Sequence, residues 1–203
     1  MKPAVDLWRY ENEARNDGFT CICGIDEAGR GPLAGPVCAA AVILPPDADI
    51  PGLNDSKKLT EKKHEALFPI IREQALAYAI AFGSVEEIEA YNILRATLMT
   101  MQKAVKGLAI TPDIALVDGN QPPKLDIPVR TIIKGDALSA SIAAASILAK
   151  VSRDHLLLQY DEAYPVYGFA KHKGYGTAEH IAAIREYGPS PVHRMSFIRK
   201  FLP

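Results

Sequence analysis

Short apolar runs alternate with longer amphipathic stretches along this chain. The first two runs, residues 21–26 and 36–44, are separated by a short stretch that contains the glycine-rich segment GRGPLAG, and this arrangement predicts a hairpin of two strands. Further apolar runs predict strands over residues 77–83, 114–117 and 127–133. Strands that alternate with helices after an opening hairpin indicate an α/β layer with a mixed sheet.

Helices are expected where apolar residues recur every three or four positions. One is expected over residues 60–76, where Pro69 should shorten or kink it. A second begins after Ser84, which forms a capping box with Glu87, and it extends to Gly107.

The third helix is expected over about 136–160, and its first half consists mostly of Ala and Ser. Such small side chains let a helix lie unusually close to a sheet. A Gly/Pro-rich stretch, residues 164–176, then separates it from a short basic helix over residues 177–187. We therefore divide the chain into a body, residues 1–165, and a C-terminal helical extension, residues 166–203.

Composition places the chain among ordinary globular proteins. It has 203 residues, of which 48% are hydrophobic and 23% are charged, and this excludes disordered and fibrous classes. No apolar stretch approaches the roughly 20 residues of a membrane span, and the N-terminal residues lack the apolar segment of a secretory signal. We expect a cytoplasmic protein with no membrane association, and a monomer by default.

The three cysteines form neither a CxxC pair nor an even set. This argues against a disulfide framework and against a thiolate zinc site. Because Cys21, Cys23 and Cys38 lie in apolar runs, we expect them to be small buried hydrophobic residues.

Net charge is −1, but it is distributed unevenly. The chain from Lys171 onward carries six basic and two acidic residues, so the rest is net acidic. A basic end on an acidic body suits a protein that holds a phosphate backbone with one part and cations with the other. A solvated C-terminal surface explains the charge equally well.

Three acidic residues stand where apolar strands end. Asp26 and Glu27 follow the first run, and both can serve one site if the chain turns at Glu27, which Gly29 permits. Asp118 follows the run 114–117, and the carboxyl ends of strands are where open α/β sheets bind ligands. Each acid taken alone is also explained as a turn residue.

A fourth acid, Asp136, begins the third helix, where an acid is also favoured as a cap. A close approach of this helix to the sheet would bring Asp136 toward the other three acids. Four converging carboxylates repel one another, and hard divalent cations such as Mg²⁺ or Mn²⁺ remove that penalty. Two such ions, roughly 3.5–4 Å apart, can activate a water and stabilise the leaving oxygen in phosphodiester cleavage.

The glycine-rich segment after the first strand is not a dinucleotide-binding fingerprint, because its third Gly is one residue late and a strand follows it. Its Gly29, Arg30 and Gly31 expose backbone groups beside a guanidinium, which suits close approach by a sugar-phosphate chain.

Two further segments carry groups that suit a phosphate chain. Ser56 and Lys57 precede the first helix, and Lys171 and Lys173 lie in a glycine loop with Tyr175, which is placed for stacking. A solvated cap is an equal explanation of the first segment. His172 in the same loop is a candidate proton-transfer group, although a solvated histidine is the commoner case.

Six separated motifs resemble those of the ribonuclease HII family, in the order that the family has them, from about Cys23 to Tyr187. They are IDEAGRGPLAGP from Ile25, NDSKKL from Asn54, VDG from Val117, KGD from Lys134, SIAAASILAKVSRD from Ser141 and HKGYGT from His172.

The resemblance implies a ribonuclease H-like fold, in which helices flank a mixed central sheet and a small helical extension ends the chain. It implies an endonuclease that cleaves RNA in RNA–DNA hybrids, including single ribonucleotides embedded in duplex DNA, during replication and repair. It places two Mg²⁺ or Mn²⁺ ions on Asp26, Glu27, Asp118 and Asp136.

The resemblance also assigns recognition of the RNA–DNA junction. It places junction reading on Gly29, Arg30 and Gly31, and stacking against the deoxyribose that follows the ribonucleotide on Tyr175. The backbone of the turn would then recognise the 2′-OH. The cut is expected 5′ of the ribonucleotide, leaving 3′-hydroxyl and 5′-phosphate ends. Ser56, Lys57, Lys171 and Lys173 are expected to contact phosphates without reading sequence.

Two other functions remain open. Another two-metal nuclease, such as a junction resolvase or a proofreading exonuclease, would also use four acids, but it would not need a reader of the 2′-OH. A non-catalytic hybrid-binding module would gain affinity by losing negative charge at its phosphate site, so four retained acids argue against it. The terminal segment 199–202 is a candidate contact for a sliding clamp.

Overall fold

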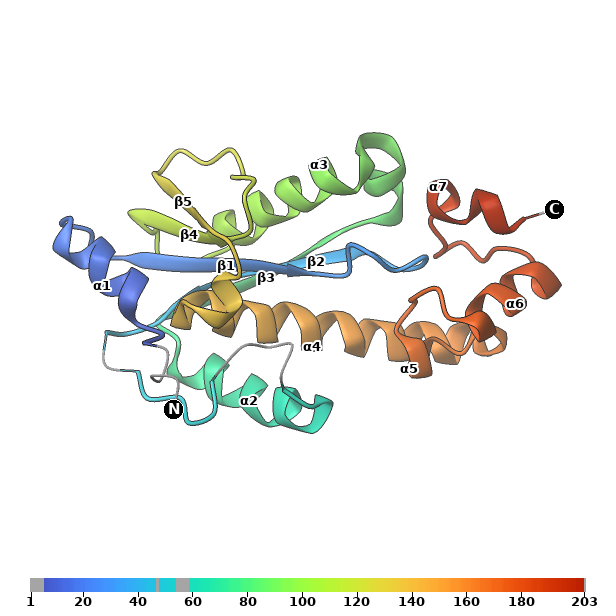
Figure 1. Ribbon diagram of the computed structural model, residues 1–203, viewed down its shortest axis with the longest axis horizontal. Coiled ribbons are helices and arrows are strands. Elements are labelled where there is room, and N and C mark those ends of the chain that lie inside the picture. The colour runs from blue at the N-terminus through green and yellow to red at the C-terminus, as the bar shows by residue number, and fades with distance from the viewer. Residues whose placement is uncertain (1–5, 47, 54–58, 203) are drawn as a thin grey trace.

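A computed structural model describes residues 6–46, 48–53 and 59–202. Within these residues a five-stranded mixed sheet has the order β3-β2-β1-β4-β5 (Figure 1). Strand β2 pairs antiparallel with both β1 and β3, whereas β4 pairs parallel with β1 and with β5. This confirms the predicted hairpin and mixed sheet. The strands are β1 (Ile22–Ala28), β2 (Val37–Ile43), β3 (Ala77–Gly83), β4 (Ile114–Asp118) and β5 (Val129–Ile132).

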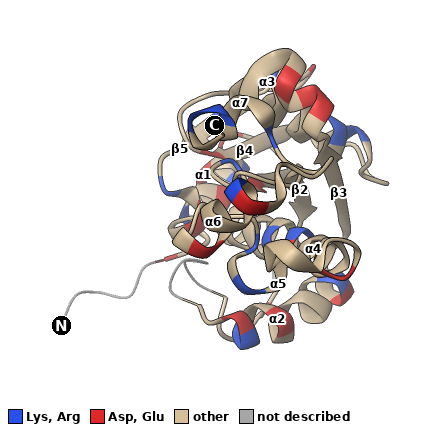
Figure 2. Ribbon diagram, turned by 90° about the vertical axis from the view of Figure 1, so that its right-hand side faces the viewer, with Lys and Arg blue, Asp and Glu red and all other residues tan. Residues whose placement is uncertain are grey.

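Helices cover both faces of the sheet. One face packs against α3 and the other against α4, with α2 outside α4, and the end-on view separates these layers (Figure 2). The α-helices are α1 (Arg9–Asn16), α2 (Glu61–Gln74), α3 (Val85–Lys106), α4 (Ala140–Ala163), α5 (Phe169–His172), α6 (Ala178–Tyr187) and α7 (Met195–Ile198). Short 3₁₀ turns lie at Gly135–Ala137, Pro165–Tyr167 and Arg199–Phe201.

Helix α4 lies against the backbone of β1, as its small side chains predict. A Cβ built on Gly24 would lie 2.1 Å from the carbonyl carbon of Ser141, so only glycine fits there. Beyond this contact, Ala144 and Ala145 are fully buried against β2 and α2 in the largest apolar cluster. This close contact fixes the distance between α4 and the sheet, and with it the position of α4 relative to the ends of the strands.

Two helices differ from the prediction. Helix α2 continues past Pro69 to Gln74. Pro69 and Glu65 both lie on the exposed side, so the carbonyl that loses its amide partner is open to water. Helix α3 has a kink that the apolar pattern does not reveal: Asn92 has φ of 67° and its side chain accepts a hydrogen bond from the amide of Arg95, which restarts the helix.

The prediction that a helix begins at Asp136 is wrong. Asp136 lies in a separate 3₁₀ turn, and α4 begins at Ala140 after its N-cap, Ser139. Glu11 of α1 supports this start, because its Oε1 accepts hydrogen bonds from the hydroxyls of Ser139 and Ser141 at 2.6 and 2.7 Å. The polar helix α1 has no apolar stripe that predicts it, and this contact anchors it.

Two strand ends also differ. The expected turn at Glu27 is wrong, since β1 continues through Ala28 and the left-handed turn comes at Gly29, with φ of +92°. Strand β5 is shorter than residues 127–133, and it begins only after Pro128, which has no amide to donate.

The C-terminal elements form their own apolar cluster. Phe169, Ile184 and Ile198 pack with Leu157 of α4 and with Leu33, which follows the glycine-rich turn. The predicted helix over residues 177–187 is confirmed as α6, with Thr177 as its N-cap, but it is not basic, since it carries Arg185 against Glu179 and Glu186. The division between residues 165 and 166 stays a prediction.

Cys23 and Cys38 are buried and unpaired as expected, whereas Cys21 is only half-buried. Within the described part of the chain, no helix combines the length and apolar character that a membrane span needs.

Candidate active site

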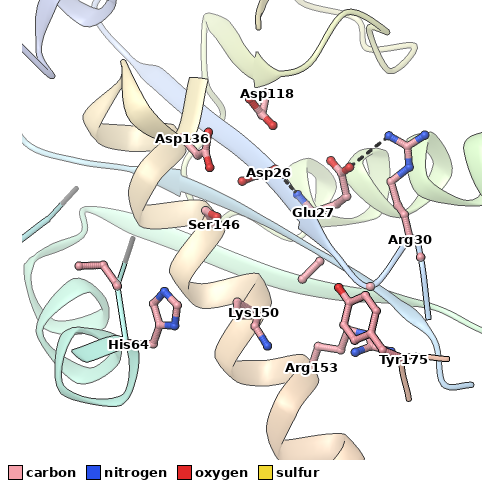
Figure 3. Close-up of a pocket in the computed structure, with 14 residues that line it drawn as sticks. Asp26, Glu27, Arg30, His64, Asp118, Asp136, Ser146, Lys150, Arg153 and Tyr175 are labelled. Atoms are coloured by element: carbon pink, nitrogen blue, oxygen red, sulfur yellow. Dashed lines mark hydrogen bonds and ion pairs between the residues drawn. The ribbon is translucent and has the colours of Figure 1, made fainter. Parts of the chain in front are cut away.

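A pocket of about 460 Å³ opens at the carboxyl end of β1 (Figure 3). All four acids predicted from the sequence line it, together with the glycine-rich turn and Tyr175. The lining residues are Asp26, Glu27, Ala28, Gly29, Arg30, Gly31, Leu59, His64, Asp118, Asp136, Ser146, Lys150, Arg153 and Tyr175.

Asp26 and Glu27 both reach the pocket although adjacent strand residues point to opposite faces. The pairing of β1 with β4 ends at Ile25 and Val117, so the following residues of β1 have an open edge on that side. Asp26 lies beneath α4, where Ser146 hydrogen-bonds to it, and its Oδ1 accepts the amide of Glu27 at 2.7 Å. The open edge thus replaces the turn that the sequence suggested.

Asp118 and Asp136 are joined through the backbone. Oδ1 of Asp118, at the end of β4, accepts a 2.6 Å hydrogen bond from the amide of Gly135. This contact places the 3₁₀ turn, and with it the buried side chain of Asp136, at the mouth of the parallel strands. The convergence of the four acids in one pocket is therefore built from three separate elements.

The pocket disfavours negative charge on its own acids. Burial raises the pKa of Asp26 well above its ordinary value, and repulsion from Glu27 and Asp118 raises it further. Burial also raises the pKa of Glu27, although Arg30, which pairs with it at 3.4 Å, lowers it in part. A bound cation would offset both penalties.

These donors fit hard divalent cations. The four acids offer only carboxylate oxygens, which Mg²⁺ and Mn²⁺ prefer. No group of three or more His, Cys, Asp and Glu side chains among the described residues is arranged to hold one ion by itself. Magnesium sites at phosphates commonly use one or two carboxylates and complete their shells with water and substrate oxygens. The arrangement agrees with ions that are shared with a phosphate chain.

The glycine-rich turn and Tyr175 lie side by side, although 144 positions separate Gly31 from Tyr175 in the sequence. A Cβ built on Gly31 would lie 3.6 Å from Cε1 of Tyr175, and the tyrosine is 48% exposed. The amide of Leu33 donates to the carbonyl of Gly174 at 2.8 Å and ties the two segments together. An exposed ring thus stands beside the turn, as stacking requires.

The residues predicted to contact phosphates are not found among the described residues that line the four-acid pocket. Ser56 and Lys57 lie outside the described residues. Neither Lys171 nor Lys173 lines the pocket: Lys171 pairs with Glu179 at 2.6 Å, and Lys173 donates to the carbonyl of Ala170 at 2.6 Å. His172 is buried, so the interpretation of a solvated loop histidine is wrong.

Sequence reasoning missed several residues of the pocket. Ser146, Lys150 and Arg153 all project from α4 into it, and His64 comes from α2. The spacing of the three α4 residues, four and then three positions, marks one helical face, and a polar stripe in a helix of small and apolar residues is the signal that could have found them.

The comparison with known proteins decides the family. The family model for ribonuclease HII matches residues 23–200. The chain belongs to the ribonuclease HII family. It is 62% identical to ribonuclease HII of Dechloromonas aromatica over 176 residues, which cover 87% of this chain and 90% of that one. It is 59% identical to ribonuclease HII of Desulfitobacterium hafniense over 191 residues, covering 94% of this chain and 74% of the relative.

Solved structures share the fold. Ribonuclease H2 from Pyrococcus horikoshii superposes with a TM-score of 0.76 at 26% identity, covering 90% of this chain and 97% of that one. RNase HII of Archaeoglobus fulgidus, solved in complex with PCNA, gives 0.71 at 25% identity over 87% and 94% of the two chains. Bst-RNase HIII in complex with Mn²⁺ gives 0.62 at 21% identity over 86% and 65%.

The ribonuclease HII family accounts for the expected fold and enzyme class. The mixed sheet with flanking helices is the predicted ribonuclease H-like fold. The protein is a ribonuclease H hydrolase that acts on RNA–DNA hybrids. The family therefore excludes the two alternatives, another two-metal nuclease such as a resolvase or exonuclease, and a non-catalytic binding module.

Proposed function

We propose that this ribonuclease H is a metal-dependent endonuclease that cuts 5′ of a ribonucleotide, including a single ribonucleotide embedded in duplex DNA. It would leave 3′-hydroxyl and 5′-phosphate ends and serve ribonucleotide removal during replication and repair. The observation that carries the proposal is the contact between the turn at residues 29–31 and Tyr175 at the edge of the four-acid pocket.

In this proposal the four acids hold the metal ions. Asp26, Glu27, Asp118 and Asp136 would ligate two Mg²⁺ or Mn²⁺ ions. When bound, such ions supply an activated water and neutralise charge at the leaving oxygen. Bst-RNase HIII, which shares the fold, was solved in complex with Mn²⁺, and this supports the choice of a divalent cation. Ser146 keeps the Asp26 carboxylate in place, and Lys150, which also lines the pocket, is held by an ion pair with Asp154.

Two groups would read the two sugars that follow the cut on its 3′ side, the ribose and the next sugar. Backbone groups of the turn formed by Gly29, Arg30 and Gly31 would contact the 2′-OH, the group that distinguishes RNA from DNA. The exposed ring of Tyr175 would stack on the following sugar, where a flat ring accepts a deoxyribose and a 2′-OH would obstruct it. Ser56, Lys57, Lys171 and Lys173 would contact phosphates farther along the duplex.

We propose a cytoplasmic monomer with a catalytic domain over residues 1–165 and a substrate-contacting extension over residues 166–203. The segment 199–202 would contact a sliding clamp, and the solved PCNA complex of Archaeoglobus fulgidus RNase HII supports such a contact.

A panel of substrates tests the function. Wild type and Asp118→Asn are each incubated with Mn²⁺ and three duplexes: a uniform RNA–DNA hybrid, a DNA duplex with one ribonucleotide, and the all-DNA duplex. We expect wild type to cut the first two only, and Asp118→Asn to cut none. Cleavage of the all-DNA duplex, or no cleavage of the single-ribonucleotide duplex, would overturn the proposal.

A further inference from the structure

Two fully buried arginines lie beneath the glycine-rich turn. Arg153 comes from α4 and is 1% exposed, whereas Arg194 precedes α7 and is 0% exposed. Among the described residues no carboxylate forms an ion pair with either guanidinium, and every hydrogen bond that they donate goes to a backbone carbonyl. Buried charges of this kind need a structural or functional reason.

The two arginines divide the carbonyls of residues 29–36 between them. Arg194 donates to the carbonyls of Gly29, Arg30, Pro32 and Gly35 at 2.6 to 2.9 Å. Its guanidinium therefore fixes the backbone of the turn itself. Burial and the neighbouring charge of Arg153 together lower the pKa of Arg194 to about 9, so the side chain is still protonated at neutral pH.

Arg153 instead joins two segments. Its Nη2 donates to the carbonyl of Ala34 and its Nε to that of Pro36, on the strand side of the turn, at 3.0 and 3.1 Å. Its Nη1 donates to the carbonyl of Lys173 at 3.0 Å, two residues before Tyr175. Figure 3 shows this side chain reaching from α4 toward Tyr175. Gly29 lies directly on it, since a Cβ there would be 2.0 Å from Nε.

We propose that Arg153 is a positioning residue that couples the turn at residues 29–31 to Tyr175, so that the sugar carrying the 2′-OH and the following sugar are read at one fixed separation. The hydrogen bonds that the structure gives the Arg194 guanidinium go to carbonyls of residues 29–35, and none goes to the segment that carries Tyr175. This inference rests on the proposed function, because it assigns the two readings to these two segments. A planar guanidinium makes all three bonds of Arg153 at once, whereas a lysine ammonium cannot match that fork.

The test compares kcat/KM on a DNA duplex with one ribonucleotide and on a uniform RNA–DNA hybrid, whose following sugar is a ribose. The ratio of the two values reports junction reading. We expect Arg153→Lys to lower this ratio about tenfold, as the loss of charge-assisted hydrogen bonds allows. Arg194→Lys should lower both values together and leave the ratio nearly unchanged. Arg185→Lys, an exposed arginine of the same extension, is the matched control and should behave as wild type.

A double-mutant cycle separates coupling from general damage. If Arg153 acts through Tyr175, adding Arg153→Lys to Tyr175→Ala should lower the ratio no further than Tyr175→Ala alone. Gly174→Ala is a second route to the same uncoupling, since its Cβ would lie 2.8 Å from the carbonyl oxygen of Ala34. It should lower the ratio while Arg153 stays intact. The thermal shift produced by Mn²⁺ shows for each variant that the four-acid pocket is still folded.

The outcomes are distinct. A wild-type enzyme that does not cut the single-ribonucleotide duplex, or a ratio that Tyr175→Ala leaves unchanged, overturns the proposed function and this inference together. A ratio that falls with Tyr175→Ala but not with Arg153→Lys or Gly174→Ala overturns this inference alone. Independent losses that multiply in the double variant also overturn it.

Discussion

The carboxylate of Asp118 accepts the backbone amide of Gly135 at 2.6 Å. One acid of the pocket therefore places the turn that carries another, Asp136. Asp118 has two separable properties in this arrangement, its hydrogen-bond acceptor and its negative charge. Substitutions that remove one or both of them distinguish support of the turn from cation binding.

Asp118→Asn keeps an acceptor for the amide of Gly135 and removes the charge. We expect cleavage to fall more than about 100-fold, because a cation ligand is lost. Without divalent cations the variant should be at least as stable as wild type, because Asp26 loses a repelling neighbour. Asp118→Ala also leaves the amide of Gly135 without this partner and should be less stable than Asp118→Asn. Thermal melts in EDTA and single-turnover rates with Mn²⁺ check both statements, and equal melting temperatures of the two variants would contradict the supporting role.

Divalent cations should stabilise the wild-type protein in a pH-dependent way. A ligand at 100 times its Kd adds about 2.7 kcal/mol to the free energy of unfolding. Since burial raises the pKa of Asp26 and Glu27, protons compete with the cation at these carboxyls, and the stabilisation should grow as the pH rises. Thermal melts with and without Mn²⁺ at several pH values measure this. A thermal shift of equal size in Asp26→Asn would count against the assignment of the site.

The contact of α4 with β1 predicts a large effect from a single methyl group. Gly24→Ala would place its Cβ 2.1 Å from the Ser141 carbonyl carbon and 2.3 Å from the Ile142 amide nitrogen, and neither backbone atom can move without shifting α4. We expect a loss of about 3 kcal/mol or more in the free energy of unfolding. Gly52→Ala, where a Cβ meets nothing within 4 Å, is a control without a steric clash, and it already includes the strain of φ +88°, which Gly24 does not have. Urea titrations compare the two variants, and similar midpoints would contradict the close approach.

Two buried histidines, His180 and His193, support the backbone around Tyr175. Nδ1 of His180 lies 2.9 Å from the carbonyl oxygen of Tyr175 and must donate to it, so Nε2 of His180 accepts from Nε2 of His193 at 3.0 Å. Nδ1 of His193 in turn accepts the amide of Ser190 at 2.9 Å. Both rings are thus held neutral, and burial lowers the pKa of His180 and of His193 to about 4.

This arrangement predicts a loss of stability in acid. Between about pH 6.5 and 4 the unfolded chain takes up protons at these histidines while the fold resists them, so the free energy of unfolding falls as the pH falls. The slope is up to about 1.4 kcal/mol per pH unit for each histidine. His193→Gln should flatten the pH dependence relative to wild type, whereas His155→Gln, which removes an exposed histidine, should not. Urea titrations at pH 7, 6 and 5 measure the slopes, and parallel slopes for wild type and His193→Gln would refute the prediction.

Local sequence predicts those parts of the fold that depend on local pattern. The strands near Ile25 and Val117 follow from apolar runs, and the capping box at Ser84 and Glu87 forms as its sequence predicts. Asp26, Glu27 and Asp118 could be predicted because charged residues directly follow apolar strands there, whereas Asp136 is predicted from its place before a helix of small residues. Their convergence in one pocket follows from parallel pairing of β1 and β4 and from the small residues of α4.

The remaining features depend on contacts between distant segments, which local patterns do not encode. Helix α1 is polar and is held by hydrogen bonds from Ser139 and Ser141 to Glu11. Arg153 and Arg194 look like surface cations in the sequence, yet backbone carbonyls of a distant loop bury them. The phosphate roles of Lys171 and Lys173 were inferred from charge alone and stay predictions.

The most direct test of the account places one altered sugar in an otherwise identical DNA duplex. The position carries a ribose, a deoxyribose or a 2′-fluoro-deoxyribose, and the end-labelled strand is incubated with wild-type protein and Mn²⁺, with EDTA as the control. The account predicts a single metal-dependent cut on the 5′ side of the ribose and none at the other two sugars. Comparable cutting at the deoxyribose or 2′-fluoro position, or a cut elsewhere than 5′ of the ribose, would contradict it.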